Sequence, residues 1–169
     1  EIIYGQEGFV YDNYRYIEND RGCKPGNGLD SIGTCEIVPS KGGSVVVKTT
    51  RGGKLASQVI TYTFLPNGIV DMDVTITPQA KELRRAGLVA SINPGLRKVN
   101  YYAYGPWENY NDRKENCMVG RFETTVDDMV VYYQKPQTMG GREGLRELTL
   151  TNAKGQGICI ETQGDVAFS

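Results

Sequence analysis

The sequence predicts an all-β protein built from antiparallel sheets. Two observations support this prediction. Short runs rich in β-branched and aromatic residues recur along the 169-residue chain, and turn signals containing glycine, asparagine or proline separate them. With 21 glycines and short strands at such spacing, a sandwich of antiparallel sheets is the expected architecture. We expect one domain over residues 1–169, because this length suffices to bury a hydrophobic core.

The clearest strand lies at residues 68–77, where apolar residues alternate with polar ones as in a half-buried strand. The run 57–65 precedes it, and the Asn-Gly pair within residues 66–68 suits a tight hairpin that needs positive φ. Further strands are expected at 32–38, 44–50, 88–92, 98–104, 146–151 and 157–161. Two segments have a helical option: 80–85 is expected to form one turn, and 124–133 is expected to be irregular with a short strand.

Composition excludes several classes of function. The net charge is -1, with acidic and basic residues mixed along the chain, so no footprint for nucleic acid is present. No apolar run reaches the length of a membrane span, and the N-terminus resembles no signal peptide. The first residue is not Met, so we expect a processed protein or a piece of a longer one.

Histidine is missing from the sequence, which excludes Ser-His-Asp and Cys-His nucleophilic schemes. Catalysis by this chain alone is therefore the lesser hypothesis, and no catalytic residue is assigned. The four cysteines lie far apart, at spacings that do not favour a zinc site, so no metal site is expected. They are interpreted as buried or free thiols: Cys23, Cys35, Cys117 and Cys159. A Cys23–Cys35 disulfide in an oxidising compartment stays open as an alternative.

The stretch YYAYGPWENYNDRK at residues 101–114 places tyrosines and the one tryptophan beside acidic, amide and basic side chains. Aromatic faces next to carboxylates and amides can hold sugars, which gives five candidate carbohydrate-binding residues: Trp107, Glu108, Asn109, Tyr110 and Arg113. The same polar groups can instead bond to the backbone of the turn, with Arg113 clamping a carboxylate. Because buried turn networks are commoner than binding sites, the structural interpretation is preferred, and the carbohydrate site stays open.

Two other segments gather charge. Residues 14–28 contain Glu18, Asn19 and Asp20, which do not follow an EF-hand pattern and are interpreted as a salt-bridged strand end. A catalytic pair of Glu18 and Asp20 stays open, since carboxylate separation is a spatial quantity. In residues 132–150, two arginines could hold an anion or pair with neighbouring acids. The residues concerned are Arg142, Glu143, Arg146 and Glu147.

Three motifs in order resemble the C-terminal "small chain" domain of the family 2 glycoside hydrolases, the β-galactosidases. YRYIENDRG at 14–22 resembles the strand and loop F-x-R-A-P-T-D-N-D-R-G. YYAYGPWENYNDR at 101–113 is similar to Y-G-x-G-P-x-E-N-Y-x-D-R, with Ala103 and Tyr104 in the middle positions. YYQKPQTMGGREGLREL at 132–148 resembles Y-x-x-P-Q-E-x-G-N-R followed by R-x-L, with Thr138 for Glu and Gly141 for Asn.

The resemblance implies an antiparallel supersandwich of the galactose-mutarotase-like type. It further implies a fragment of a larger bacterial enzyme, of the cytoplasm or periplasm, that hydrolyses galactosides with retention. The two catalytic glutamates and the magnesium of that family belong to a separate (β/α)₈ barrel, so no cofactor is expected in this chain. The expected partners are that barrel and a galactoside-type carbohydrate, with self-association through exposed edge strands.

Three interpretations follow, each with a structural expectation. A non-catalytic domain that completes the active-site mouth of the parent enzyme predicts that the aromatic turn is buried or faces a missing domain. An autonomous carbohydrate-binding module predicts that Trp107 is exposed and lines a concave pocket. A purely structural domain predicts that the polar atoms of the turn are satisfied by the domain's own backbone. The first is preferred.

Overall fold

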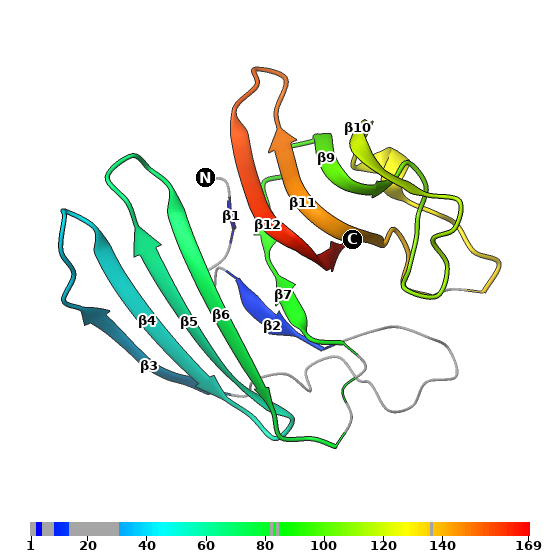
Figure 1. Cartoon of the computed structure of the whole chain (residues 1–169). Helices are drawn as coiled ribbons and strands as arrows, with labels where there is room; N and C mark the ends of the chain where they lie inside the picture. The colour runs from blue at the N-terminus through cyan, green and yellow to red at the C-terminus, as the bar shows by residue number, and fades with distance from the viewer. Residues whose placement is uncertain (1–2, 5–8, 14–30, 82, 84, 136) are drawn as a thin grey trace. The chain divides into compact units, whose positions relative to one another are not determined.

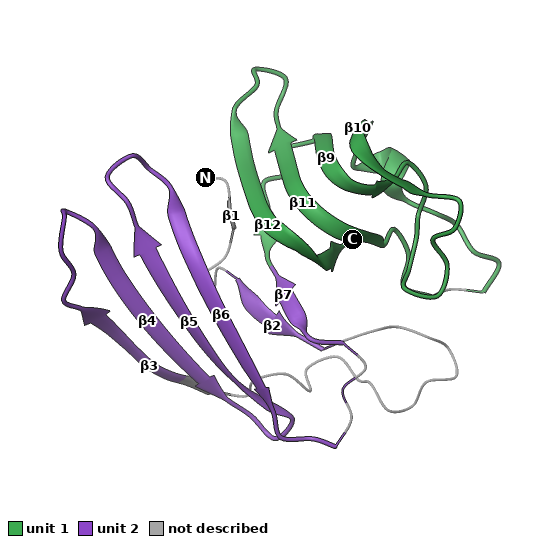
Figure 2. Ribbon diagram, viewed as in Figure 1, with its two compact units in different colours: residues 1–8, 90–169 green, residues 9–89 purple. Residues whose placement is uncertain are grey.

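The computed structural model describes residues 3–4, 9–13, 31–81, 83, 85–135 and 137–169. Within these residues the chain is made of strands in antiparallel sheets and contains no α-helix, which confirms the all-β prediction (Figure 1). Contacts divide the chain into two compact units, one of residues 9–89 and one of residues 1–8 with 90–169 (Figure 2). The expectation of one domain over residues 1–169 stays a prediction.

The elements follow in chain order. They are β1 (Ile3–Tyr4), β2 (Val10–Asp12), β3 (Ser31–Val38), β4 (Val45–Gly52), β5 (Ala56–Phe64), β6 (Val70–Pro78), β7 (Gly87–Val89), β8 (Ser91–Ile92), β9 (Lys98–Gly105), β10 (Met118–Thr125), the 3₁₀ helix η1 (Asp127–Met129), β11 (Arg142–Thr151) and β12 (Gly157–Phe168).

The unit of residues 9–89 contains a four-stranded meander with the order β3-β4-β5-β6, and a separate pair of β2 with β7. The expected hairpin between β5 and β6 is present, and Gly68 takes the positive φ of 86° that its turn requires. Asn67 supports the turn because its side-chain oxygen accepts a hydrogen bond from the Ile69 amide at 3.1 Å. Every second residue in the first half of β5 is buried: Ala56, Gln58 and Ile60. This strand lies between β4 and β6 in the meander.

The unit that ends at residue 169 contains a four-stranded sheet with the order β10-β9-β11-β12, and a separate pair of β1 with β8 (Figure 1). Strand β9 pairs with β10 on one side and β11 on the other, and its alternate residues Val99, Tyr101 and Ala103 are buried in the core. Leu145 of β11 completes the buried cluster. Around it pack partly buried apolar residues: Phe122, Met129, Leu148, Leu150 and Phe168.

Several boundaries differ from the sequence-based expectation. The predicted strand 88–92 is two short strands, β7 and β8, because its halves pair with different partners. Strand β10 was not predicted, and strand β12 runs to Phe168 rather than ending at 161. The segment 124–133 is irregular as expected, but it holds the last residues of β10 and the helix η1 instead of a short strand of its own. The described residues of 80–85 form no helical turn.

Candidate functional site

The aromatic stretch forms the end of β9 and the start of the connection to β10. At its base, Gly105 allows close packing, because a Cβ at this position would lie 2.7 Å from the Phe122 ring. The Tyr101 hydroxyl, from the buried face of β9, donates to the Pro106 carbonyl at 3.0 Å. The connection therefore leaves the sheet with its backbone tied to the core.

Asn109 is fully buried and bonds only to backbone. Its Nδ2 donates to the carbonyls of Tyr104 (3.1 Å) and Trp107 (2.9 Å), which closes the turn. Its Oδ1 accepts from the amide of Glu143 at 2.9 Å, and its own amide donates to the Gly141 carbonyl at 2.8 Å. The amide side chain of Asn109 therefore finds its hydrogen-bond partners within the domain, as a buried polar group requires.

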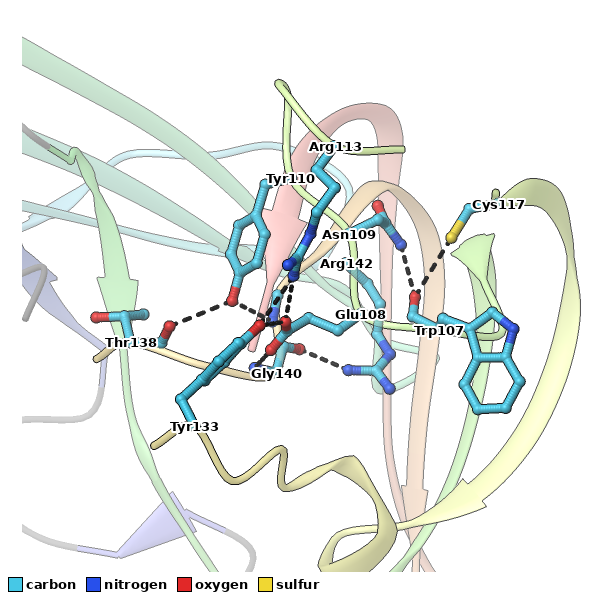
Figure 3. Close-up of polar contacts among 11 residues, drawn as sticks. Trp107, Glu108, Asn109, Tyr110, Arg113, Cys117, Tyr133, Thr138, Gly140 and Arg142 are labelled. Carbon is cyan, nitrogen blue, oxygen red and sulfur yellow. Dashed lines mark hydrogen bonds and ion pairs between the residues drawn. The ribbon is translucent and has the colours of Figure 1, made fainter. Parts of the chain in front are cut away.

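Glu108 is the acid at the centre of the turn, with a side chain only 5% exposed (Figure 3). Its Oε1 accepts from Arg113 Nη2 at 2.6 Å and from the Tyr133 hydroxyl, and its Oε2 accepts from the Gly140 amide at 2.6 Å. Burial alone raises the pKa of Glu108. The hydrogen bonds from Tyr133, Gly140 and Tyr110, with the charge of Arg113, outweigh this effect and leave the pKa below its ordinary value.

Tyr110 continues the contact to the same segment. Its hydroxyl donates to the Thr138 carbonyl at 3.3 Å and accepts from the Gly141 amide at 3.5 Å, and its ring packs under the Arg113 guanidinium, 5.4 Å from the centroid. Burial, with the nearby Glu108 carboxylate, raises the pKa of Tyr110 to about 12. Tyr110 thus stays neutral at physiological pH and acts as a hydrogen-bonding and packing group.

Three consecutive residues of the turn therefore each bond to residues 133–143. Glu108 reaches Tyr133 and Gly140, Asn109 reaches residues 141 and 143, and Tyr110 reaches residues 138 and 141 (Figure 3). Two sequence motifs that lie about thirty positions apart are the two halves of one interlocked structure. We refer to these contacts as the turn lock.

Trp107 lies apart from the turn lock. Its side chain is 70% exposed, while its carbonyl accepts from Asn109 and from the Cys117 thiol at 3.6 Å. Figure 3 shows the indole projecting away from the Glu108 group. The ring borders a hollow of about 270 Å³, which is lined by Trp107, Glu108, Arg113, Lys114, Glu115, Asn116 and Cys117.

The five predicted carbohydrate-binding residues are thus close in the chain but differ in surroundings. Glu108, Asn109 and Tyr110 make the turn lock, Arg113 contacts Glu108 and the Tyr110 ring, and Trp107 points outward. The expected clamp of Arg113 on a carboxylate is present, made by one nitrogen to Glu108. Tyr133 and Gly140 were not predicted as parts of the site, although the resemblance at residues 132–148 gave a signal for them. For the five predicted residues, a role in binding carbohydrate stays a prediction.

The arginines of β11 do not pair with the acids suggested by the sequence. Arg142 is buried, donates from Nη1 to the Gly140 carbonyl at 2.7 Å and lies 5.8 Å from the Tyr101 ring centroid. Arg146 lies over Tyr102 and donates to the Gly144 carbonyl. Glu147 is bound by Arg121 of the neighbouring strand at 2.8 Å. Both β11 arginines therefore bind backbone carbonyls and lie over aromatic rings.

The cysteines and the acidic segment near the N-terminus were the other candidates for chemistry. Cys35, Cys117 and Cys159 are free thiols, and Cys23 lies outside the described residues, as does the segment 14–28 with Glu18 and Asp20. In the part of the chain that the structure describes, no three His, Cys, Asp or Glu side chains gather in a way that could hold a metal ion. None of the described helices is long and apolar enough to cross a membrane.

The chain has the all-β fold that its resemblance to a glycoside hydrolase domain implied, and comparison with known proteins identifies the family. The family model described as "Beta galactosidase small chain" matches residues 17–169, so the chain belongs to this family. Beta-galactosidase of Priestia megaterium is 29% identical over 69% of the chain, and that of Halalkalibacterium halodurans is 31% identical over 72%. Beta-galactosidase of Photobacterium profundum is 30% identical over 80% of the chain.

These relatives are much longer proteins. The matched part covers 12%, 13% and 14% of the three relatives, respectively. The chain thus corresponds to one region of a β-galactosidase.

Proposed function

We propose that this chain is a non-catalytic domain of a β-galactosidase-like glycoside hydrolase. In this proposal it packs on the catalytic barrel of the parent enzyme and helps to shape the pocket that binds a galactoside-type carbohydrate. The observation that carries the proposal is the family match over residues 17–169, combined with the small share of each relative that the chain covers.

The chemistry of the turn supports a non-catalytic role. Hydrolysis of glycosides uses two carboxyl groups, one of which acts as a general acid with a raised pKa. The buried acid of this site, Glu108, has a pKa below its ordinary value, so it stays ionised and cannot deliver a proton near neutral pH. Its oxygens are engaged by Arg113, Tyr133 and Gly140. The retaining two-carboxylate chemistry and its magnesium then reside in the barrel of the parent.

The turn lock also supports the role of a domain that shapes a neighbouring pocket. A domain that shapes a neighbouring pocket has to present its surface on a fixed backbone, because interface precision depends on supporting contacts. The bonds of Glu108, Asn109 and Tyr110 to residues 133–143 supply such support.

The proposal is tested by comparing two proteins in an assay with a nitrophenyl galactoside. The 169-residue chain alone is expected to release no nitrophenol, while the parent enzyme is expected to lose activity when this region is deleted. Hydrolysis by the isolated chain would contradict the non-catalytic role. Full activity of the deleted parent would contradict the contribution to the pocket.

We also propose that copies of the chain associate through edge strands. In the meander of the unit 9–89 the outer strands are β3 and β6, and in the sheet of the other unit they are β10 and β12. Unpaired backbone groups along such edges are templates for pairing with another chain.

A further inference from the structure

Trp107 combines an exposed ring with a fixed backbone. The side chain is 70% exposed, yet Asn109 holds the Trp107 carbonyl and the Tyr101 hydroxyl holds the preceding Pro106 carbonyl. A large apolar side chain on a rigid backbone loses little conformational freedom when it is buried by a partner. Tryptophan is also among the residues that contribute most to protein interfaces.

A second large apolar side chain lies at the same end of the sheet. Met118 is 76% exposed, directly follows Cys117 of the hollow, and lies opposite Gly105 in the register of β9 and β10. Methionine adapts its shape readily and is common at binding surfaces. Trp107, Met118 and the hollow together are called the tryptophan surface.

The charges around the hollow balance. Arg113 and Lys114 supply two positive charges, and Glu108 and Glu115 supply two negative ones, so the lining has no net preference for an anion or a cation. Lys114 lies 5.4 Å from the Tyr104 ring centroid, which places its amine close to the sheet. The matching partner surface is therefore apolar at its centre, with hydrogen-bonding groups at its rim.

We propose that the tryptophan surface is a contact between this domain and the remainder of the parent polypeptide. The inference rests on the proposed function, because it names the residues of this chain that meet the parent. The relatives extend far beyond the matched region, which covers 12–14% of their length, so ample protein surface exists outside this chain to cover Trp107 and Met118.

Carbohydrate is the competing occupant, because an exposed Trp107 beside a hollow is what an autonomous carbohydrate-binding module predicts. The groups around the ring favour protein. A sugar site needs free polar groups beside the aromatic ring to bind hydroxyls. Asn109 is fully buried with its side chain bonded to backbone, and the oxygens of Glu108 are occupied inside the turn lock. The polar side chains left in the lining are Lys114, Glu115 and Asn116, and Glu115 already accepts from the Lys114 amide. The two exposed side chains that define the tryptophan surface, Trp107 and Met118, are apolar and suit a protein surface.

Cross-linking of the full-length parent enzyme tests this inference. An amine-reactive, photoactivated cross-linker on Lys114, which lines the hollow, is expected to join residues outside the 169-residue region. Trp107→Ala is expected to lower the yield of this link severalfold. Tyr132→Ala is the matched control, because Tyr132 is 90% exposed but does not line the hollow, and it is expected to leave the yield unchanged.

A second measurement is needed because a variant can alter the yield of the Lys114 cross-link without removing the contact. The thermal midpoint of the parent is expected to fall in Trp107→Ala and Met118→Glu, and to stay unchanged in Tyr132→Ala. Links from Lys114 that lie only within this chain or join a second copy would overturn the inference, as would loss of the link on addition of lactose. If deletion of the region abolishes activity while Lys114 links only internally, the proposed function stands and this inference fails.

Discussion

Glu108 shows what distinguishes a structural acid from a catalytic one. A carboxylate that accepts from a guanidinium, a hydroxyl and a backbone amide has its charge stabilised inside the fold, so its protonation is disfavoured. A general acid needs the opposite environment. At the scale of single residues, the role of Glu108 is to hold the turn, and this role can be measured.

Replacing Glu108 with Gln keeps the size of the side chain and removes its charge. We expect Glu108→Gln to lower the free energy of unfolding by about 1–3 kcal/mol, because hydrogen bonds from Arg113, Tyr133 and the Gly140 amide to a charged acceptor weaken. Urea denaturation measures the change. Glu123→Gln is the control, since Glu123 is exposed on β10, and it is expected to change stability by less than about 0.5 kcal/mol. Equal effects of both variants would contradict the turn lock.

Protonation of Glu108 in acid should weaken the hydrogen bonds that its carboxylate accepts. The folded state lowers the pKa of Glu108, so its contribution to stability is present above the ordinary glutamate pKa and is lost as pH falls through the lowered value. We therefore expect the gap in unfolding free energy between wild type and Glu108→Gln to narrow below pH 4.5, the ordinary value. A gap that stayed constant from neutral pH to well below this range would show that the carboxylate charge contributes nothing.

At the scale of elements, the turn lock depends on close approach between the turn and residues 133–143. A Cβ at Gly141 would lie 2.5 Å from the Tyr110 ring, whose position is fixed by Thr138 and Arg113. We expect Gly141→Ala to destabilise the chain by about 1–3 kcal/mol through overpacking, measured by urea denaturation.

Gly52→Ala provides the matched control for that variant. Gly52 lies in β4, and a Cβ there would meet no atom within 4 Å, so its replacement is expected to be neutral or slightly stabilising. If Gly141→Ala were as well tolerated as Gly52→Ala, the turn and the later segment would not be packed as described.

The sequence predicts elements well where their periodicity is local. Strand β6 was visible because apolar residues recur at every second position, and the hairpin before it was visible from Asn67 and Gly68. Strand β10 was missed because Gly120 interrupts it and its inward face depends on Phe122, which is recognisable only once Tyr101 packs against it at 5.3 Å. The division between β7 and β8 depends on their distant partners.

The candidate site shows the same limit. A clamp of Arg113 on a carboxylate of its own turn could be predicted, and the structure identifies the partner as Glu108, five positions away. The bonds of Glu108 to Tyr133 and Gly140 span 25 and 32 positions, so residue chemistry alone could not place them. The exposure of Trp107 and the enclosure of its neighbour Asn109 were likewise a matter of tertiary packing.

At the scale of the whole molecule, edge strands bear on how the chain behaves in solution. Val70 of the edge strand β6 and Val45 of the interior strand β4 flank Phe64 in register, and both are exposed. A charge on an edge strand discourages pairing with another chain. We expect Val70→Lys to reduce concentration-dependent association in sedimentation velocity and Val45→Lys to leave it unchanged. Equal reduction by both would assign the association to the sheet face instead of its edge.

The central claim is that this chain completes a β-galactosidase-like enzyme without supplying its chemistry. The most direct test adds the separate 169-residue chain to the parent enzyme that lacks this region and follows hydrolysis of a nitrophenyl galactoside. We expect activity to rise with added chain to a plateau, and to rise less with the Glu108→Gln chain, whose turn lock is weakened. Activity that stays at the level of the deleted parent at every concentration of added chain would contradict the claim.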